Sequence, residues 1–145
     1  MQRAFRWNTR IVTALVVFFD LLTVGMGMGV PFFTILLGFP LGWYFARRAH
    51  LAGDGAGKAL RRVFRWSVMV VVFTVAVLAV IWGPAVVMLA DPAADLANFG
   101  IPLILYTPRA SFIGWILLMV LVSPLLQGLA ALGAAYATFM RLWRA

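Results

Sequence analysis

Four polar side chains lie deep inside apolar segments of this 145-residue chain, and their types decide which chemistry those segments could carry. Asp20 can bind and release a proton, whereas Thr34, Thr74 and Gln127 can donate and accept hydrogen bonds. An ionisable side chain in the middle of a bilayer is costly, so Asp20 is by default a candidate functional group. Together the four residues form a candidate buried polar or proton site.

The depth of these residues follows from counting along a helix from the nearest basic residue. At the rise of an α-helix, Asp20 lies about 15 Å from Arg10, and Gln127 lies about 21 Å from Arg141. Both values fall near the middle of a hydrocarbon layer about 30 Å thick. The sequence places no Lys, Arg or His at that depth. We therefore expect Asp20 to be uncharged and hydrogen-bonded to Gln127, to a threonine or to a carbonyl that a proline leaves free.

The elements that position these residues are apolar segments of membrane-spanning length. Hydrophobic residues make up 65% of the chain and charged residues 11%, against the roughly 45–50% apolar content of soluble domains. The pattern predicts an all-α integral membrane protein, a single membrane domain over residues 1–145 that forms a four-transmembrane-helix bundle. The expected helices cover residues 9–24, 31–46, 66–89 and 111–142.

The connections between these helices differ in character. A short, glycine-rich outer hairpin joins the first two helices, a basic loop with a helical end covers residues 47–65, and an outer loop covers residues 90–110. Within the outer loop, Asp91 before Pro92 is typical of a helix start and Gly100 of a helix stop. We therefore expect a short interfacial helix over residues 92–99.

The distribution of charge predicts the orientation. The net charge is +8, and the basic residues cluster before the first helix, between the second and third, and after the fourth, with Arg109 alone on the other side. By the positive-inside rule, both termini and the loop 47–65 face the cytoplasm, which predicts a multi-pass protein of the bacterial cytoplasmic (inner) membrane. A charge distributed in this way indicates topology and not nucleic-acid binding.

Four of these basic residues recur at helical spacing: Lys58, Arg61, Arg62 and Arg65. Such a face, next to the membrane, predicts contact with anionic lipid headgroups. The alternative is that these charges only set the topology and have no dedicated ligand.

Two of the expected helices contain residues that bend a helix or allow close helix packing. Proline removes a backbone hydrogen bond, and glycine lets another backbone approach. The candidate hinge and packing residues are Gly38, Pro40 and Gly42 in the second helix, and Ser123, Pro124 and Gly128 in the fourth. After Pro124 the sequence is rich in Ala and Gly, which predicts a smooth face for packing within the protein or between copies.

The residue inventory excludes several functions. The chain has no Cys, no Glu and one His, so neither a cysteine-based metal site nor a pair of catalytic carboxylates with a nearby base is expected. We therefore expect no metal, no cofactor and no enzymatic activity.

Two function classes remain. The first is a small non-catalytic membrane protein that acts as an assembly or interaction subunit, as a homo-oligomer or as part of a larger membrane complex. The alternative is a small proton- or ion-coupled transporter or channel in which Asp20 is the titrating group. The scarcity of polar residues in the spans favours the first class, and the cost of burying Asp20 favours the second.

Overall fold

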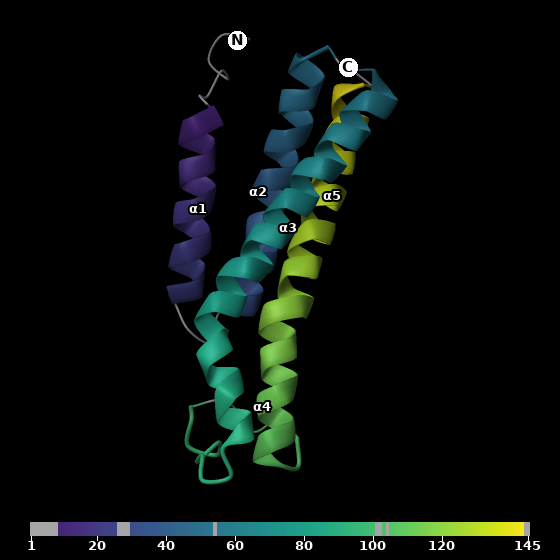
Figure 1. Cartoon of the computed structure of the whole chain (residues 1–145). Helices are drawn as coiled ribbons and strands as arrows, with labels where there is room; N and C mark the ends of the chain where they lie inside the picture. The colour runs from purple at the N-terminus through teal and green to yellow at the C-terminus, as the bar shows by residue number, and fades with distance from the viewer. Residues whose placement is uncertain (1–8, 26–29, 54, 101–102, 104, 144–145) are drawn as a thin grey trace.

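The computed structural model describes residues 9–25, 30–53, 55–100, 103 and 105–143, and it describes no side chain for residues 9, 20, 23–25 and 30. All regular secondary structure in this part of the chain is helical, as the sequence predicts. The elements are α1 (Thr9–Gly25), α2 (Val30–Leu51), α3 (Ala56–Val87), a 3-10 turn η3 (Met88–Ala90), α4 (Pro108–Leu117), a π-helical turn η4 (Leu118–Val122) and α5 (Ser123–Leu142) (Figure 1). The last three follow one another without a break and form one long helix.

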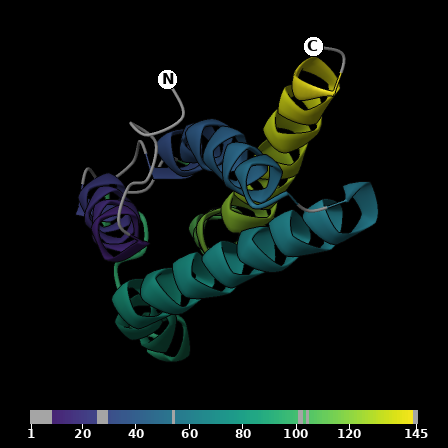
Figure 2. The ribbon, with the colours of Figure 1, turned by 90° about the horizontal axis from the view of Figure 1, so that it is seen from above.

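The helices form an elongated bundle in which α2, α3 and α5 pack together and α1 lies at the edge (Figures 1 and 2). The largest contact is between α2 and α5, and α1 packs only lightly against α2 and α3. The start of α1, the turn between α2 and α3 and the end of α5 lie at one end of the bundle, and the loop between η3 and α4 lies at the other. The basic residues of the segment 47–65 and Arg141 are therefore gathered at the same end.

The basic segment 47–65 is helical over most of its length. The start of α3 at Ala56 agrees with the helical end that the sequence predicts for this segment. The first part of the segment differs from the prediction, because α2 continues beyond residue 46 to Leu51. Arg, Lys, Ala and Leu are all strong helix formers, so the charges of Arg and Lys do not end a helix. The end of α2 is set instead by Gly53, whose φ of 69° is typical of the residue after a helix.

The expected helix over residues 92–99 is wrong, because the structure has turns there. The Asp91 carboxylate accepts a hydrogen bond from the Ala93 N–H at 2.9 Å, and the Asp95 carboxylate accepts one from the Asn98 side chain at 2.6 Å. Such local bonds compete with helix formation, and a helix of that length is marginal without tertiary packing. The outer hairpin at residues 26–29 lies outside the described residues.

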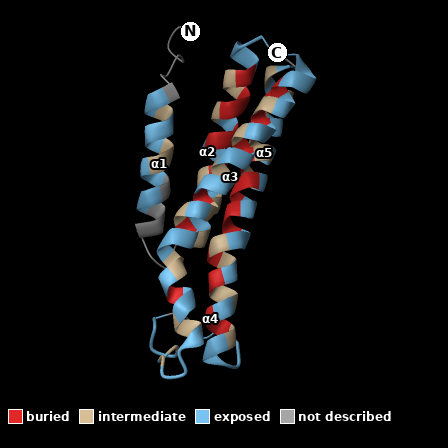
Figure 3. Ribbon diagram, in the orientation of Figure 1, coloured by how far each residue is buried: buried red, intermediate tan, exposed pale blue. Residues whose placement is uncertain are grey.

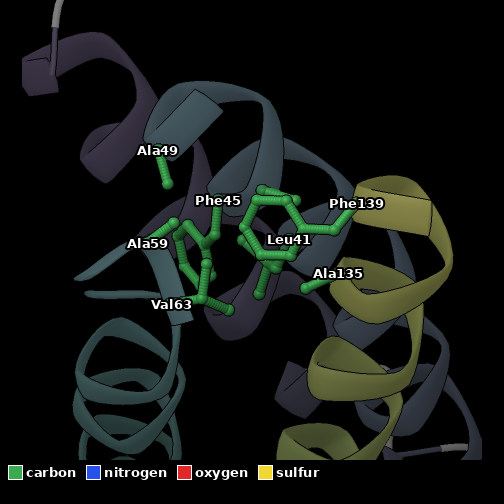
Figure 4. Packing of buried hydrophobic residues seen from close by; sticks show 8 residues of the cluster. Leu41, Phe45, Ala49, Ala59, Val63, Ala135 and Phe139 are labelled. Atoms are coloured by element: carbon green, nitrogen blue, oxygen red, sulfur yellow. The ribbon is translucent and has the colours of Figure 1, made fainter. Parts of the chain in front are cut away.

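The buried side chains lie between α2, α3 and the long helix that α4, η4 and α5 form (Figure 3). The largest cluster fills the end of the bundle with the basic residues, where Phe45 of α2 lies among small and aliphatic side chains of α3 and α5 (Figure 4). Its buried members are Leu41, Phe45, Ala46, Ala49, Ala59, Val63, Ala135 and Phe139. Two smaller clusters, around Met119 and around Phe112, continue this core toward the opposite end.

Two helices in the described part of the chain are long and apolar enough to cross a membrane. They are Ala56–Ala90 and Pro108–Leu142, each of 35 residues, and α1 contains a shorter apolar stretch, Arg10–Phe19. In the most apolar 18-residue stretch of each long helix, only 17% of the first and 28% of the second is buried within the protein. Since the core helix of a soluble protein would be mostly buried, this exposed apolar surface is of the kind that a bilayer covers.

Candidate functional site

The closest helix contact is made by two glycines of α2 against the backbone of α5, and we call this contact the glycine seam. A Cβ atom added to Gly38 would overlap the Gln127 carbonyl oxygen and lie 2.9 Å from the Ala130 Cβ. One added to Gly42 would overlap the Ala131 carbonyl oxygen and lie 2.6 Å from its carbon. The Gly-x-x-x-Gly spacing is therefore used inside the molecule, where it lets two backbones touch.

A third glycine plays the same part between α3 and α5. A Cβ atom added to Gly128 would lie 2.7 Å from Cγ2 of Val71, so the small residue lets α3 approach α5. Pro40, the other packing residue predicted in α2, lies on the exposed side, and α2 continues through it. The three glycines thus bring α2 and α3 onto adjacent faces of α5.

Two of the predicted polar residues meet at this junction. The Thr74 Oγ1 of α3 lies 3.0 Å from the Gln127 Oε1 of α5 and also 3.0 Å from the Val70 carbonyl oxygen. Both side chains are buried, with 0% and 1% of their surface exposed. Because a hydroxyl carries one proton, Thr74 donates to only one of these acceptors at a time. The pair is a direct polar link between α3 and α5.

Thr34 and Ser123 lie one helical turn away from this link. Gly38 contacts Gln127 and Gly42 contacts Ala131, so α2 and α5 run in the same direction, and Thr34, one turn before Gly38, is level with Ser123. Both are fully buried. The Ser123 hydroxyl donates to the Met119 carbonyl at 3.1 Å, while the Thr34 hydroxyl and the Gln127 side-chain nitrogen have no hydrogen-bond partner among the described residues. We call Thr34, Thr74, Ser123 and Gln127 the polar cluster.

Pro124, directly after Ser123, interrupts the backbone hydrogen bonding of the long helix beside the polar cluster. A proline has no N–H and cannot bond the carbonyl one turn back. The turn before it, Leu118–Val122, is π-helical, and Pro124 itself is fully buried in the first turn of α5. A π-helical turn is one of the known ways in which a long helix absorbs such a disruption, and such turns are frequent at functional sites. The hinge predicted at Ser123 and Pro124 therefore coincides with an irregular turn.

Asp20 belongs to α1, but its side chain lies outside the described residues. Its helix packs on α2 and α3, on the side of the bundle away from α5 in Figure 1. The hydrogen bond predicted for Asp20, to Gln127, to a threonine or to a carbonyl that a proline leaves free, therefore lies outside the described residues.

The four basic residues predicted to contact lipid lie on the first turns of α3. Lys58, Arg61 and Arg65 are exposed, whereas Arg62 is partly buried with its guanidinium carbon 5.9 Å from the centre of the Trp66 ring. Of the apolar residues between them, Val63 is buried in the core but Leu60 and Phe64 are exposed. This part of α3 is therefore basic and apolar on the same outer surface.

Sequence reasoning missed a groove between α1, α2 and α3 near this basic surface. Tyr44, Arg48 and Trp66 line it together with valine side chains of α1 and α3. The sequence feature that could have indicated the groove is the presence of Tyr44, Trp66 and Arg48, since aromatic and basic residues gather at a membrane interface. Spacing along the chain does not reveal a groove that three separate helices form.

Within the described residues, no three His, Cys, Asp or Glu side chains are grouped so that they could hold a metal ion. Comparison with protein-family models, with curated proteins and with solved structures finds no match for this chain. What the site can do chemically follows from its residues alone: glycines, hydroxyls and one amide hold three helices together at short distance.

Proposed function

We propose that this chain is a small non-catalytic membrane subunit with four spans, which acts by packing its helices against another membrane protein. Both termini and the α2–α3 turn lie on the cytoplasmic side in this proposal, as the positive-inside rule predicts. The observation that carries it is that α5 has a face of small residues filled from within the molecule and a second, exposed face on which large apolar residues flank a glycine.

The filled face of α5 contains Gly128, Ala131 and Ala135, which are buried against α2 and α3. The other face centres on Gly133, where an added Cβ atom would meet nothing within 4 Å. We call this second surface the outer α5 face. It comprises Leu125, Leu126, Leu129, Gly133, Tyr136 and Ala137, all exposed.

The chemistry of the outer α5 face favours a helix as its partner. Leu129 and Tyr136 are each 63% exposed on either side of Gly133, so a partner helix could fit a side chain against the glycine. Small residues flanked by large ones are the usual composition of helix contacts in membranes. Since most assemblies are symmetric homo-oligomers, a second copy of the chain is the first partner to test.

Cysteine cross-linking tests this proposal cleanly, because the natural chain contains no cysteine. In native membranes under an oxidising catalyst, Gly133→Cys is expected to give a covalent dimer of this chain. The matched control is Val80→Cys, which is 76% exposed on α3 and outside the outer α5 face, and it is expected to remain monomeric. A cross-link of Gly133→Cys to a different protein would instead identify a larger complex.

A flux measurement in liposomes distinguishes the subunit function from proton- or ion-coupled transport. Asp20→Asn is expected to leave proton and ion flux in liposomes at the level of the unmodified chain. Loss of a measurable flux on this substitution, together with monomeric Gly133→Cys protein, would contradict the subunit function and favour the transporter.

A further inference from the structure

The groove between α1 and the α2–α3 pair is open and has a volume of about 370 Å³. Sites for small molecules typically range over roughly 300–1,000 Å³, so it is large enough for part of a ligand. Val16 of α1, Phe45 of α2 and Val70 of α3 contribute apolar walls. The groove is therefore suited to an apolar chain.

One end of the groove is polar and positively charged. Arg48 lines it, donates a hydrogen bond to the Tyr44 hydroxyl at 3.1 Å and lies with its guanidinium carbon 5.5 Å from the centre of the Trp66 ring. Arg62 lies 5.9 Å from the same ring. These contacts hold the guanidinium of Arg48 at the groove, and its planar fork of N–H donors fits phosphate oxygens well.

The surroundings of that end are also cationic. Between Arg47 and Arg65 the sequence has six Lys or Arg residues and a single acidic residue, Asp54. The field of such a region attracts an anion and disfavours a cation. Charge complementarity thus favours an anionic ligand at the mouth of an apolar groove.

The two ends of the groove together favour a lipid as the occupant. On α3 the lining runs from Trp66 to Phe73, eight residues or roughly 10 Å at helical rise. One end is cationic and the remaining walls are apolar, which matches a molecule with an anionic headgroup and an apolar chain. An apolar helix would match only the apolar walls.

We propose that this groove binds one anionic phospholipid, with an acyl chain between α1 and the α2–α3 pair and the phosphate at Arg48. This site differs from the exposed headgroup contacts of Lys58, Arg61 and Arg65, because it holds the apolar part of the lipid as well. It is also independent of the outer α5 face, which lies on a different helix.

The headgroup contact is tested with the full chain, stripped of lipid in detergent and exposed to equal amounts of phosphatidylglycerol and phosphatidylcholine. Native mass spectrometry is expected to show one bound lipid per chain, with phosphatidylglycerol preferred. Arg48→Gln is expected to lower that preference about fivefold, the typical contribution of one charge near an anionic surface. The matched control is Arg47→Gln, which removes the neighbouring charge outside the groove lining and is expected to retain most of the preference.

The acyl-chain contact is tested by filling the groove from an exposed position. Met69 lines the groove and is 62% exposed, whereas Val72, three residues later on α3, is 61% exposed and is not part of the lining. Met69→Trp is expected to abolish binding of both lipids, and Val72→Trp to leave it unchanged. Equal retention of the two lipids by the unmodified chain, equal binding by the two Trp variants, or a bound protein chain in place of lipid would each overturn the proposal.

Discussion

The hydrogen bond between Thr74 and Gln127 joins α3 and α5 in the interior of the bundle. Both side chains are buried, and the Gln127 side-chain nitrogen has no hydrogen-bond partner in the described part of the chain. A buried amide that loses its remaining partner costs more than the bond itself contributes, because the unpaired atom is still kept from water. The pair therefore affects the choice of the α3 and α5 faces that meet more than it affects the free energy of unfolding.

Thr74→Val is expected to lower the free energy of unfolding by about 0.6 kcal/mol and by at most about 1.7 kcal/mol, the range measured for hydrogen bonds between membrane helices. The double variant Thr74→Val with Gln127→Leu replaces both polar groups with apolar ones of similar size. It is expected to be less destabilised than the sum of the two single variants, because no unpaired amide remains. Unfolding measured in lipid bicelles for the four proteins of this cycle checks the result. Additive effects would show that the two side chains are not coupled.

Among the helices, the glycine seam determines how close α2 can lie to α5. At Gly42 an added methyl group would overlap backbone atoms of Ala131, which cannot rotate away as the end of a side chain can. The two helices would have to separate along their most extensive contact. The phenylalanine and alanine side chains of the adjacent core would lose contacts as well.

Gly42→Ala is therefore expected to destabilise the protein by about 1–3 kcal/mol, the typical cost of overpacking a well-packed core. Gly57→Ala is the matched control, since Gly57 is exposed in the first turn of α3 and an added Cβ there meets nothing within 4 Å. Its effect is expected to be neutral or slightly stabilising, because Ala forms helices better than Gly. Thermal unfolding in a mild detergent compares the two. Equal midpoints would contradict the role of the seam.

The sequence predicts the helical class and places Gly38 and Gly42 at one spacing on a helix face, because each depends on local composition or helical spacing. The depth of the polar residues in a membrane stays a prediction. The end of α2 and the start of α3 differ from the predicted residues 46 and 66, since Arg, Lys and Ala continue a helix despite the charge of this segment. The sequence could not show which helices Thr74 and Gln127 would join. The groove at Arg48 was likewise hidden, because it depends on the mutual placement of three helices.

The whole molecule has a charge polarity, because the arrangement of the helices gathers basic residues at one end of the bundle. The start of α1, the α2–α3 turn and the end of α5 lie at one end, together with the basic residues on both sides of that turn (Figure 1). The opposite end has Asp91 and Asp95, whose side chains bond within their own loop, and Arg109, which donates to the Leu89 carbonyl at 3.2 Å. An insertion with the basic end in the cytoplasm therefore satisfies the positive-inside rule without any rearrangement.

This polarity predicts which cysteine variants react in intact cells with a maleimide that cannot cross a membrane. Tyr106→Cys, in the loop before α4 where Tyr106 is fully exposed, is expected to be labelled, because the proposed orientation places that loop outside. Ala52→Cys, in the turn between α2 and α3 where Ala52 is exposed, is expected to be labelled only after the cells are opened. The natural chain lacks cysteine and serves as the blank in both experiments. The reverse pattern would mean that the basic end faces outward, which would also remove the anionic inner leaflet as the source of the lipid proposed at Arg48. Labelling of both variants in intact cells would contradict the proposal that a single span, α3, separates the two loops.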